Sequence, residues 1–213
     1  MKEAFGLVVP DRLQDLCVPS RCALIIYDMQ AGIVAQISNG PEIVERCLTL
    51  LTAARTAGFR VFFCRHVFLP TRAAGVGQLR RAMVWQKQPD PAMTKPLFRQ
   101  GSPRWEIVPE LAPREDEVVI DKITMSCFES TYLNLALRDA HMDSFIIAGI
   151  ALEVGIEPTL RHALDLNYCP VLVDDACGSA NTAVKERSIA TLKYTGEVLV
   201  ASTTEVVQAI GGH

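Results

Sequence analysis

The sequence predicts an α/β protein built on a doubly wound, six-stranded, mainly parallel sheet with helices on both faces. Two observations lead to this fold class. Six short runs rich in β-branched and aromatic residues recur along the chain, and most are apolar at successive positions. That pattern is typical of strands covered on both faces. Segments with helical spacing separate the runs, and such alternation favours right-handed βαβ crossovers.

The six expected strands share this dense apolar pattern. In chain order they are CALIIYD (22–28), RVFFCRHV (60–67), EVVID (117–121), DSFIIAGI (143–150), CPVLVDDA (169–176) and EVLVA (197–201). Ligands of doubly wound sheets bind beyond the carboxyl ends of the strands, where the strand order reverses. Functional residues are therefore expected at the strand ends, which carry Asp28, Arg65, His66, Lys122, the corner 149–155, Asp174 and Asp175.

Five segments between the strands have helical spacing. The segment 41–58 begins with Pro41 and ends with Gly58, the usual asymmetry of helix start and stop signals. The other expected helices are 130–142, 157–167, 182–196 and 203–211. Together with the strands they predict a Rossmann-like three-layer arrangement.

Length and composition favour one domain over residues 1–213. The chain is 49% hydrophobic with a formal net charge of −3, and its basic residues are dispersed. A nucleic-acid binder would concentrate them on one face, so no nucleic-acid partner is expected. No apolar run approaches the roughly 18 residues of a membrane span, and the N-terminus lacks the features of a signal peptide. We therefore expect a soluble cytoplasmic protein without a membrane partner.

The seven cysteines form no CxxC pair and show no zinc-like spacing. An odd number of cysteines, with Cys64 and Cys169 in apolar runs, favours buried thiols in a reducing compartment. The chain contains neither GxGxxG nor GxxxxGK[ST], which argues against a dinucleotide or a nucleoside triphosphate. No cofactor is expected.

Residues 68–116 interrupt the alternation of strands and helices. They hold both tryptophans and many of the prolines and basic residues, and they are too many for a plain connection. We interpret this segment as a lid or a partner-contact segment that covers the site of its own chain or of a neighbour.

Two charged residues at strand ends are candidates for chemistry. Asp28 ends an apolar strand, and partial desolvation there would raise its pKa and suit proton transfer. Lys122 directly follows EVVID and would hold that pKa down or contact an anionic substrate. The alternatives are an aspartate that caps a turn and a solvated lysine.

The corner AGIALEVGIEPT (148–159) runs from a strand into a helix. It offers backbone N–H groups that could hold an oxyanion or a substrate carboxylate. Gly155 has no Cβ that would block a close approach, although a glycine required only for the turn explains it equally well.

Five segments, in this order, resemble the isochorismatase-like hydrolase family over roughly residues 20–205. They are CALIIYDMQ, GSPRWEIVPEL, IDK, AGIALEVGIEPTLRHAL and VLVDDACGS. The resemblance implies a six-stranded parallel sheet, a homodimer or homotetramer, and a non-proline cis bond near Ile150–Ala151. Most members are amide-cleaving hydrolases with an Asp–Lys–Cys triad, which would place the acid at Asp28 and the lysine at Lys122. The cysteine of that triad falls on Gly155.

Isochorismatases proper, which cleave a vinyl ether, resemble this chain in having glycine at that position. The resemblance then implies that Asp28 acts as the general acid, that Lys122 orients it, and that the backbone from Ala151 to Gly155 holds substrate or water. The sequence departs from that branch in the residues before the glycine, where Glu153 introduces an acid. An acid there matches a dianionic substrate poorly, so isochorismate itself is not expected.

The resemblance also implies a set of substrate-binding residues at the strand ends. They are Gln30, Arg65, His66, Ile150, Ala151 and Glu153. Nicotinamidase-like relatives carry an Asp-x-His…His metal site after the second strand. Here only His66 is present, so no metal is expected.

Three hypotheses follow. The first is an Asp28-dependent acid–base hydrolase of a small metabolite, without the usual cysteine nucleophile. The second is an amide or ureide hydrolase that uses another cysteine, such as Cys127. The third is a non-catalytic relative that binds a ligand or a partner through residues 68–116.

Overall fold

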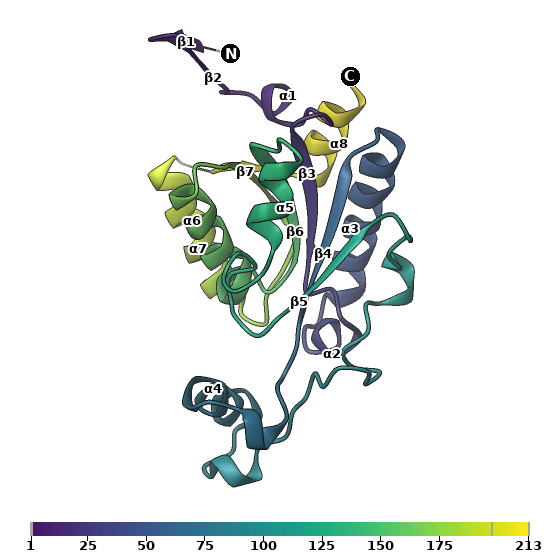
Figure 1. Ribbon diagram of the computed structural model, residues 1–213, viewed down its shortest axis with the longest axis vertical. Coiled ribbons are helices and arrows are strands. Elements are labelled where there is room, and N and C mark those ends of the chain that lie inside the picture. Colours follow the sequence, from purple (N-terminus) through teal and green to yellow (C-terminus); the bar gives the residue numbers. More distant parts are fainter. Residues whose placement is uncertain (1, 197, 213) are drawn as a thin grey trace.

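The computed structural model describes residues 2–196 and 198–212 and contains a six-stranded, all-parallel sheet between two layers of helices (Figure 1). The strand order is β5-β4-β3-β6-β7-β8. The strands are β3 (Cys22–Tyr27), β4 (Arg60–His66), β5 (Val118–Lys122), β6 (Ser144–Ile150), β7 (Cys169–Gly178) and β8 (Leu199–Ala201). The predicted fold class is confirmed, and so are the six strands to within two residues. Residue 197, where the last strand was expected to begin, lies outside the described residues.

The central strand β3 shows why these runs are apolar at successive positions. All six of its residues are buried, because each face of the sheet is covered by helices. Alternate residues pack on opposite sides: Leu24 and Ile26 join one apolar cluster, and Ile25 and Tyr27 join the other. The first cluster includes α3 (Gly40–Thr56) and α8 (Thr203–Gly211), and the second includes α5 (Leu133–Asp139), α6 (Glu157–Asp165) and α7 (Thr182–Thr195).

The helices begin and end at the residues that the sequence signals indicate. Pro41 lies in the first turn of α3, and Gly58 follows its end with φ +76°. The helix α5 is shorter than the predicted segment 130–142, because Ser130 has a left-handed φ of +58° and the helix starts three residues later. The other predicted helices are confirmed.

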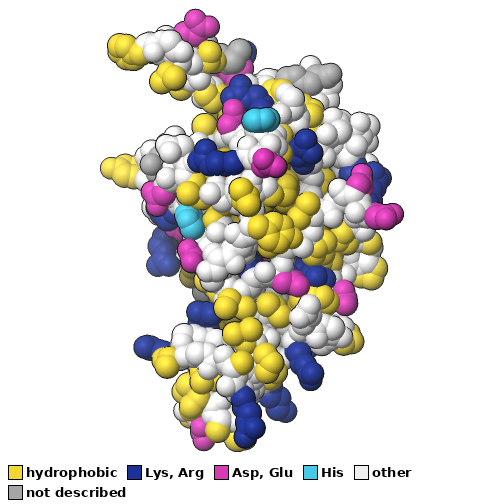
Figure 2. Space-filling model, viewed as in Figure 1, with side chains coloured by type: hydrophobic (Ala, Val, Ile, Leu, Met, Phe, Trp, Pro, Cys, Tyr) yellow, Lys and Arg dark blue, Asp and Glu magenta, His cyan; other side chains and the backbone are white. Residues whose placement is uncertain are grey.

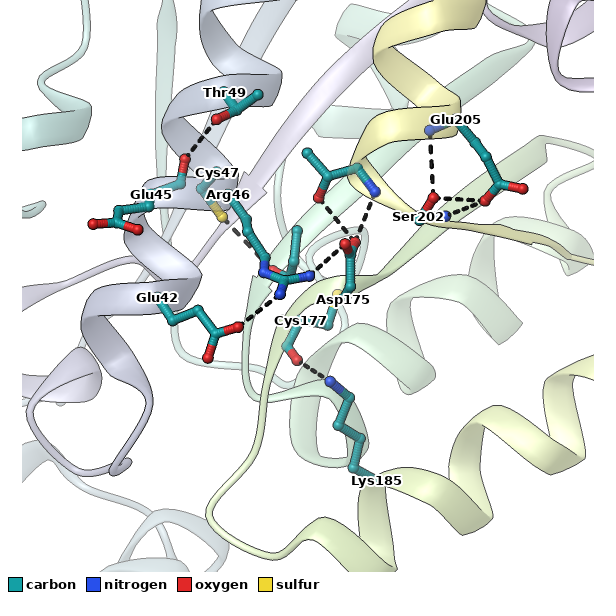
Figure 3. A network of polar contacts seen from close by, with 12 residues as sticks. Glu42, Glu45, Arg46, Cys47, Thr49, Asp175, Cys177, Lys185, Ser202 and Glu205 are labelled. Atoms are coloured by element: carbon teal, nitrogen blue, oxygen red, sulfur yellow. Dashed lines mark hydrogen bonds and ion pairs between the residues drawn. The ribbon is translucent and has the colours of Figure 1, made fainter.

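A polar network joins α3 and α8 to strand β7 (Figure 3). The Asp175 carboxylate accepts from the Arg46 guanidinium on α3. It also accepts from the backbone N–H and the hydroxyl of Thr203, at 2.7 and 2.8 Å, at the start of α8. Ser202 and Glu205 form a capping box on the same helix. Asp175, a strand-end candidate, therefore fastens helices to the sheet.

The first part of residues 68–116 lies beyond the carboxyl ends of the strands, in the lower part of Figure 1, and the last part runs back beside α3 to the start of β5. They contain α4 (Val76–Gln86) and the short helices η1 (Thr71–Ala73), η2 (Pro91–Met93) and η3 (Pro109–Leu111). A small apolar cluster of Phe68, Ala82 and Phe98 holds α4 in place, separate from the two clusters that cover the sheet. The short helix α2 (Ala31–Val34) follows β3 and packs beside this segment.

The N-terminal residues form a hairpin that the sequence analysis did not predict. Strands β1 (Lys2–Ala4) and β2 (Leu7–Val9) pair through Phe5 and Gly6, both with positive φ, and α1 (Leu13–Leu16) follows. The apolar side chains of the hairpin project from the molecule (Figure 2), and Phe5 is fully exposed. None of the described helices combines the length and the apolar character needed to cross a membrane.

Candidate active site

The strand order reverses between β3 and β6, and the candidate site lies at the carboxyl ends of these strands. Asp28 directly follows β3, and Lys122 is the last residue of β5. The two side chains meet although 94 residues separate them, with 2.9 Å between Lys122 Nζ and Asp28 Oδ2. The structure therefore brings together the two charged residues that the sequence analysis selected.

Asp28 occupies an unusual backbone position and is almost completely buried. Its φ is +49°, a left-handed conformation that aspartate tolerates better than most residues, and its N–H donates to the Cys64 carbonyl. The residue is 6% exposed. Its Oδ2 accepts from Lys122, whereas Oδ1 has no hydrogen-bond partner among the described residues. One carboxylate oxygen is thus held in place, and the other is buried without a partner among the described residues.

Burial raises the pKa of Asp28 to about 6, and the Lys122 ammonium opposes this rise. Desolvation disfavours the charged carboxylate more than the neighbouring cation stabilises it. Near neutral pH the group can therefore take up and release a proton, which is the property required of a general acid or base.

Lys122 is 3% exposed and makes three contacts through its ammonium group. Besides Asp28 Oδ2, the nitrogen lies 3.4 Å from the Thr124 carbonyl oxygen and 4.2 Å from the centre of the Tyr27 ring. The alternative of a solvated lysine is therefore wrong. Lys122 holds the Asp28 carboxylate in position through its hydrogen bond to Oδ2.

Gly155 belongs to the one-turn π-helix η4 (Leu152–Ile156) and packs directly against Tyr27. A Cβ at position 155 would lie 2.1 Å from Tyr27 Oη and 2.5 Å from Cζ. The phenol hydroxyl donates to the Met125 carbonyl and thereby fills the space where a side chain at 155 would begin. The glycine is explained by Tyr27, a residue that the sequence analysis did not select.

Gly149, at the end of β6, makes a second close approach to the same residue. Its φ is +138°, and a Cβ there would lie 2.0 Å from the Tyr27 carbonyl oxygen. The Ile150–Ala151 bond that follows is cis, as the resemblance implied.

The backbone N–H of Gly155 is already hydrogen-bonded. It donates to the Ala151 carbonyl at 3.1 Å, and the N–H of Ile156 donates to the same oxygen at 3.2 Å. Of the backbone from Ala151 to Gly155, which the resemblance implies holds substrate or water, the Gly155 N–H is therefore not a free donor, because the tight turn of η4 uses it internally.

A cavity of about 220 Å³ opens beside Asp28 and Gly155. Its walls are mainly apolar, and they include Ile150 and Ala151, as the resemblance implied. The volume is suited to a small metabolite, because sites for drug-sized ligands usually start at about 300 Å³.

Part of the long segment supplies one wall of this cavity. Trp85 of α4 and Phe98 line it together with His66. The His66 ring contacts both of them, and Phe68, edge to face, and Phe68 stacks on Phe98. Two residues of the segment 68–116 thus line the cavity of their own chain. The sequence analysis noted the tryptophans of the segment, but no local pattern identifies which aromatic rings turn inward.

His66 is buried among these rings, and its imidazole is neutral. Burial, together with the positive charges of Lys122 and Arg81, lowers the pKa of His66 to about 3. The imidazole therefore brings no positive charge to the cavity.

Glu153 lies on the wall near Gly155. Its Oε1 accepts from the Ser179 hydroxyl at 2.9 Å. Its Oε2 is buried, and no hydrogen-bond partner for it is found in residues 2–196 and 198–212. The structure thus places the unexpected acid inside the cavity.

Arg65 and Gln30 were expected to bind substrate, but neither side chain lines the cavity. Arg65 stacks on Trp105 at 3.6 Å and pairs with Asp121 at 2.9 Å. The Gln30 amide bonds to the backbone N–H and carbonyl of His66 and to the Trp105 carbonyl. Both side chains fasten the strand end to the long segment.

The cysteines are all free. Cys127 is completely buried in the apolar cluster that includes α5, α6 and α7, outside the cavity lining. Cys64 is buried as predicted. The prediction for Cys169 is wrong, because this residue starts β7 at the opposite, exposed end of the sheet. Within the described parts of the chain, no three His, Cys, Asp or Glu side chains are grouped to hold a metal ion.

Comparisons with known proteins agree with this fold. Ureidoacrylate amidohydrolase RutB from Acinetobacter baylyi is 28% identical over 196 residues, covering 84% of this chain and 78% of its own. An uncharacterized isochorismatase family protein, YecD from Escherichia coli O157:H7, is 29% identical over 192 residues, covering 88% of this chain and 95% of its own. The crystal structure of a cysteine hydrolase from Pseudomonas syringae is 27% identical, with a TM-score of 0.78 and coverage of 91% and 94%. The profile of the isochorismatase domain matches residues 22–204, and the chain therefore belongs to the isochorismatase family of hydrolases.

Proposed function

We propose that this hydrolase cleaves a small metabolite by acid–base catalysis through Asp28, with water in place of a cysteine as the nucleophile. The observation that carries the proposal is the state of the Asp28 carboxylate. Lys122 holds Oδ2, and Oδ1 is left without a partner among the described residues beside the cavity. With a pKa of about 6, the group exchanges protons near neutral pH.

The contact between Tyr27 and Gly155 supports water as the nucleophile. The family's usual cysteine falls on Gly155, and the phenol occupies the space that its side chain would need. Cys127 offers no replacement, because its thiol is buried in the core and does not reach the cavity. A general acid or base beside the cavity is the chemistry that remains.

Two kinds of bond are compatible with this arrangement. At a C–N bond, ionised Asp28 takes a proton from water while the water oxygen adds to the carbonyl carbon. The tetrahedral intermediate then expels the amine as Asp28 returns the proton to nitrogen. At a vinyl ether, protonated Asp28 gives its proton to the terminal alkene carbon. Water adds to the resulting oxocarbenium ion, a proton returns to Asp28, and the adduct separates into a carbonyl compound and an alcohol.

The test is a panel of small amides, ureides and vinyl ethers, with products followed by NMR. The names of the RutB relatives justify including ureides. For each substrate that the wild-type protein hydrolyses, Asp28→Asn should lower kcat by at least about a hundredfold, the range of general acid–base catalysis. Asp121→Asn is the matched control, because Asp121 is the penultimate residue of β5 but pairs with Arg65 outside the cavity.

Circular dichroism of each variant checks that the fold is retained. A wild-type protein that hydrolyses nothing in the panel would contradict the proposal. So would an Asp28→Asn variant with the activity of the wild type.

A further inference from the structure

The cavity holds a second carboxylate whose position the acid–base chemistry does not require. Glu153 is the second residue of η4, and its Oε1 accepts a hydrogen bond from the Ser179 hydroxyl. Its Oε2 is withdrawn from solvent and finds no partner among the residues that the structure describes. Burying a carboxylate oxygen without a donor costs free energy, so a ligand that supplies the donor gains affinity.

The charges around this oxygen are unbalanced. No lysine or arginine is among the cavity-lining residues of the described chain. Neither of the two cations that act on His66 is among those lining residues: Lys122 binds Asp28, and Arg81 bonds to the Ile123 carbonyl through one terminal nitrogen, while its buried Nε has no partner among the described residues. His66 is neutral. Glu153 therefore has no countercharge of its own.

Asp28 adds a second, independent indication of the ligand. It is more than nine-tenths buried, and its Oδ1 also has no partner within residues 2–196 and 198–212. Both free oxygens belong to residues of the same cavity. A substrate carboxylate, such as that of ureidoacrylate, would enter a cavity whose lining holds two carboxylate residues and, among the described residues, no lysine or arginine.

We propose that Glu153 selects substrates with a cationic nitrogen group, an ammonium or an amidinium, and excludes carboxylates. A neutral N–H group would satisfy the hydrogen bond but leave the buried charge uncompensated, whereas a cation supplies both. The apolar and aromatic walls, Trp85 and Phe98 among them, hold the rest of a small molecule. This inference rests on the proposed function only in taking the cavity as the substrate site.

Benzamidine, benzamide and benzoate test the inference, because they share a ring and a planar three-atom head and differ in charge and donors. Their dissociation constants are measured by ligand-observed NMR at pH 7.5. Benzamidine should bind the wild-type protein at least tenfold more tightly than benzoate and several-fold more tightly than benzamide. Glu153→Gln should weaken benzamidine binding at least tenfold and leave benzamide within about threefold, since the glutamine carbonyl still accepts.

Glu157→Gln is the matched control. Glu157 lies four residues later and pairs with Arg161 outside the cavity, so this variant should bind benzamidine within twofold of the wild type. Benzamidine that binds no more tightly than benzoate, or not at all, overturns the inference. An unchanged benzamidine affinity in Glu153→Gln, with the fold intact, does the same.

The binding assay separates this inference from the proposed function. If Asp28→Asn keeps full turnover while Glu153→Gln loses benzamidine, the acid–base role fails and the selectivity stands. If Asp28→Asn loses turnover while the three probes bind equally, the selectivity fails and the acid–base role stands.

Discussion

The contact between Gly155 and Tyr27 makes a quantitative prediction about stability. In Gly155→Ala the new Cβ would lie 2.1 Å from Tyr27 Oη and 2.6 Å from Cε1, against 3.4–4 Å for ordinary contacts. The phenol must therefore move by more than about 1 Å, within a core that is packed at crystal-like density. Such overpacking costs about 1–3 kcal/mol. The displaced hydroxyl also loses its bond to the Met125 carbonyl, which contributes roughly 0.5–1.5 kcal/mol.

We expect Gly155→Ala to lower the free energy of unfolding by about 1.5–4.5 kcal/mol, the sum of these two effects. Urea denaturation followed by circular dichroism measures it as a lower midpoint with an unchanged m-value. Gly211→Ala is the control, since no atom lies within 4 Å of the Cβ at this last residue of α8. That substitution should be neutral or stabilise by up to about 1 kcal/mol.

A double-mutant cycle then assigns the effect to the contact. Tyr27→Ala alone removes a large buried ring and should cost about 3–5 kcal/mol. Once the ring is gone, adding Gly155→Ala should cost almost nothing, so the two substitutions must be strongly non-additive. If Gly155→Ala lies within about 0.5 kcal/mol of the wild type, or if the two effects simply add, this account of the glycine is refuted.

The remaining predictions concern charge and thiols. Because the pKa of Asp28 is raised to about 6 from 3.8, this group stabilises the fold fully below pH 4 and loses that contribution as the pH rises through 6. The stability difference between the wild type and Asp28→Asn, measured in urea, should fall over this window. Lys122→Met removes the cation that opposes this rise, so the midpoint of the pH–rate profile should shift upward; an unshifted midpoint contradicts the role of the pair. Iodoacetamide should modify the exposed Cys169 and leave activity intact, because Cys127 is buried. If iodoacetamide abolishes the activity of a Cys169→Ser variant, another cysteine is required and a thiol mechanism is favoured. Arg65→Gln should lower stability and leave KM unchanged, and a raised KM would show that the arginine contacts substrate.

The sheet and its helices could be predicted because each signal is local. Apolar runs, the Pro41 and Gly58 boundaries and the alternation of strands with helices are all written in short windows of sequence. Parallel strands also end at one edge of a sheet, which is why Asp28 and Lys122 could be paired before any contact was known. The assembly state stays a prediction.

The rest of the site depends on contacts between distant segments. The Tyr27 phenol explains Gly155 only after β3 and η4 are packed together, and no pattern within either segment indicates this. Gln30 and Arg65 have the polarity of binding residues, yet their hydrogen-bonding groups are used by neighbouring backbone and side chains. Polar residues at a strand end can serve either purpose, and only the folded geometry decides between them.

The small cluster beneath α4 has a consequence for how ligands reach the cavity. Only Phe68, Ala82 and Phe98 are fully buried in it, and none belongs to the clusters that stabilise the sheet. Local unfolding free energies follow the amount of buried apolar contact, so we expect α4 to be a cooperative unit of low stability. The backbone at His66 and Trp105 is held more firmly, because the Gln30 amide bonds to both carbonyls. The amide protons of α4 will exchange with solvent by sub-global opening long before those of β3. We therefore expect the exchange of ligands with the cavity to follow the opening of α4, independently of the stability of the sheet.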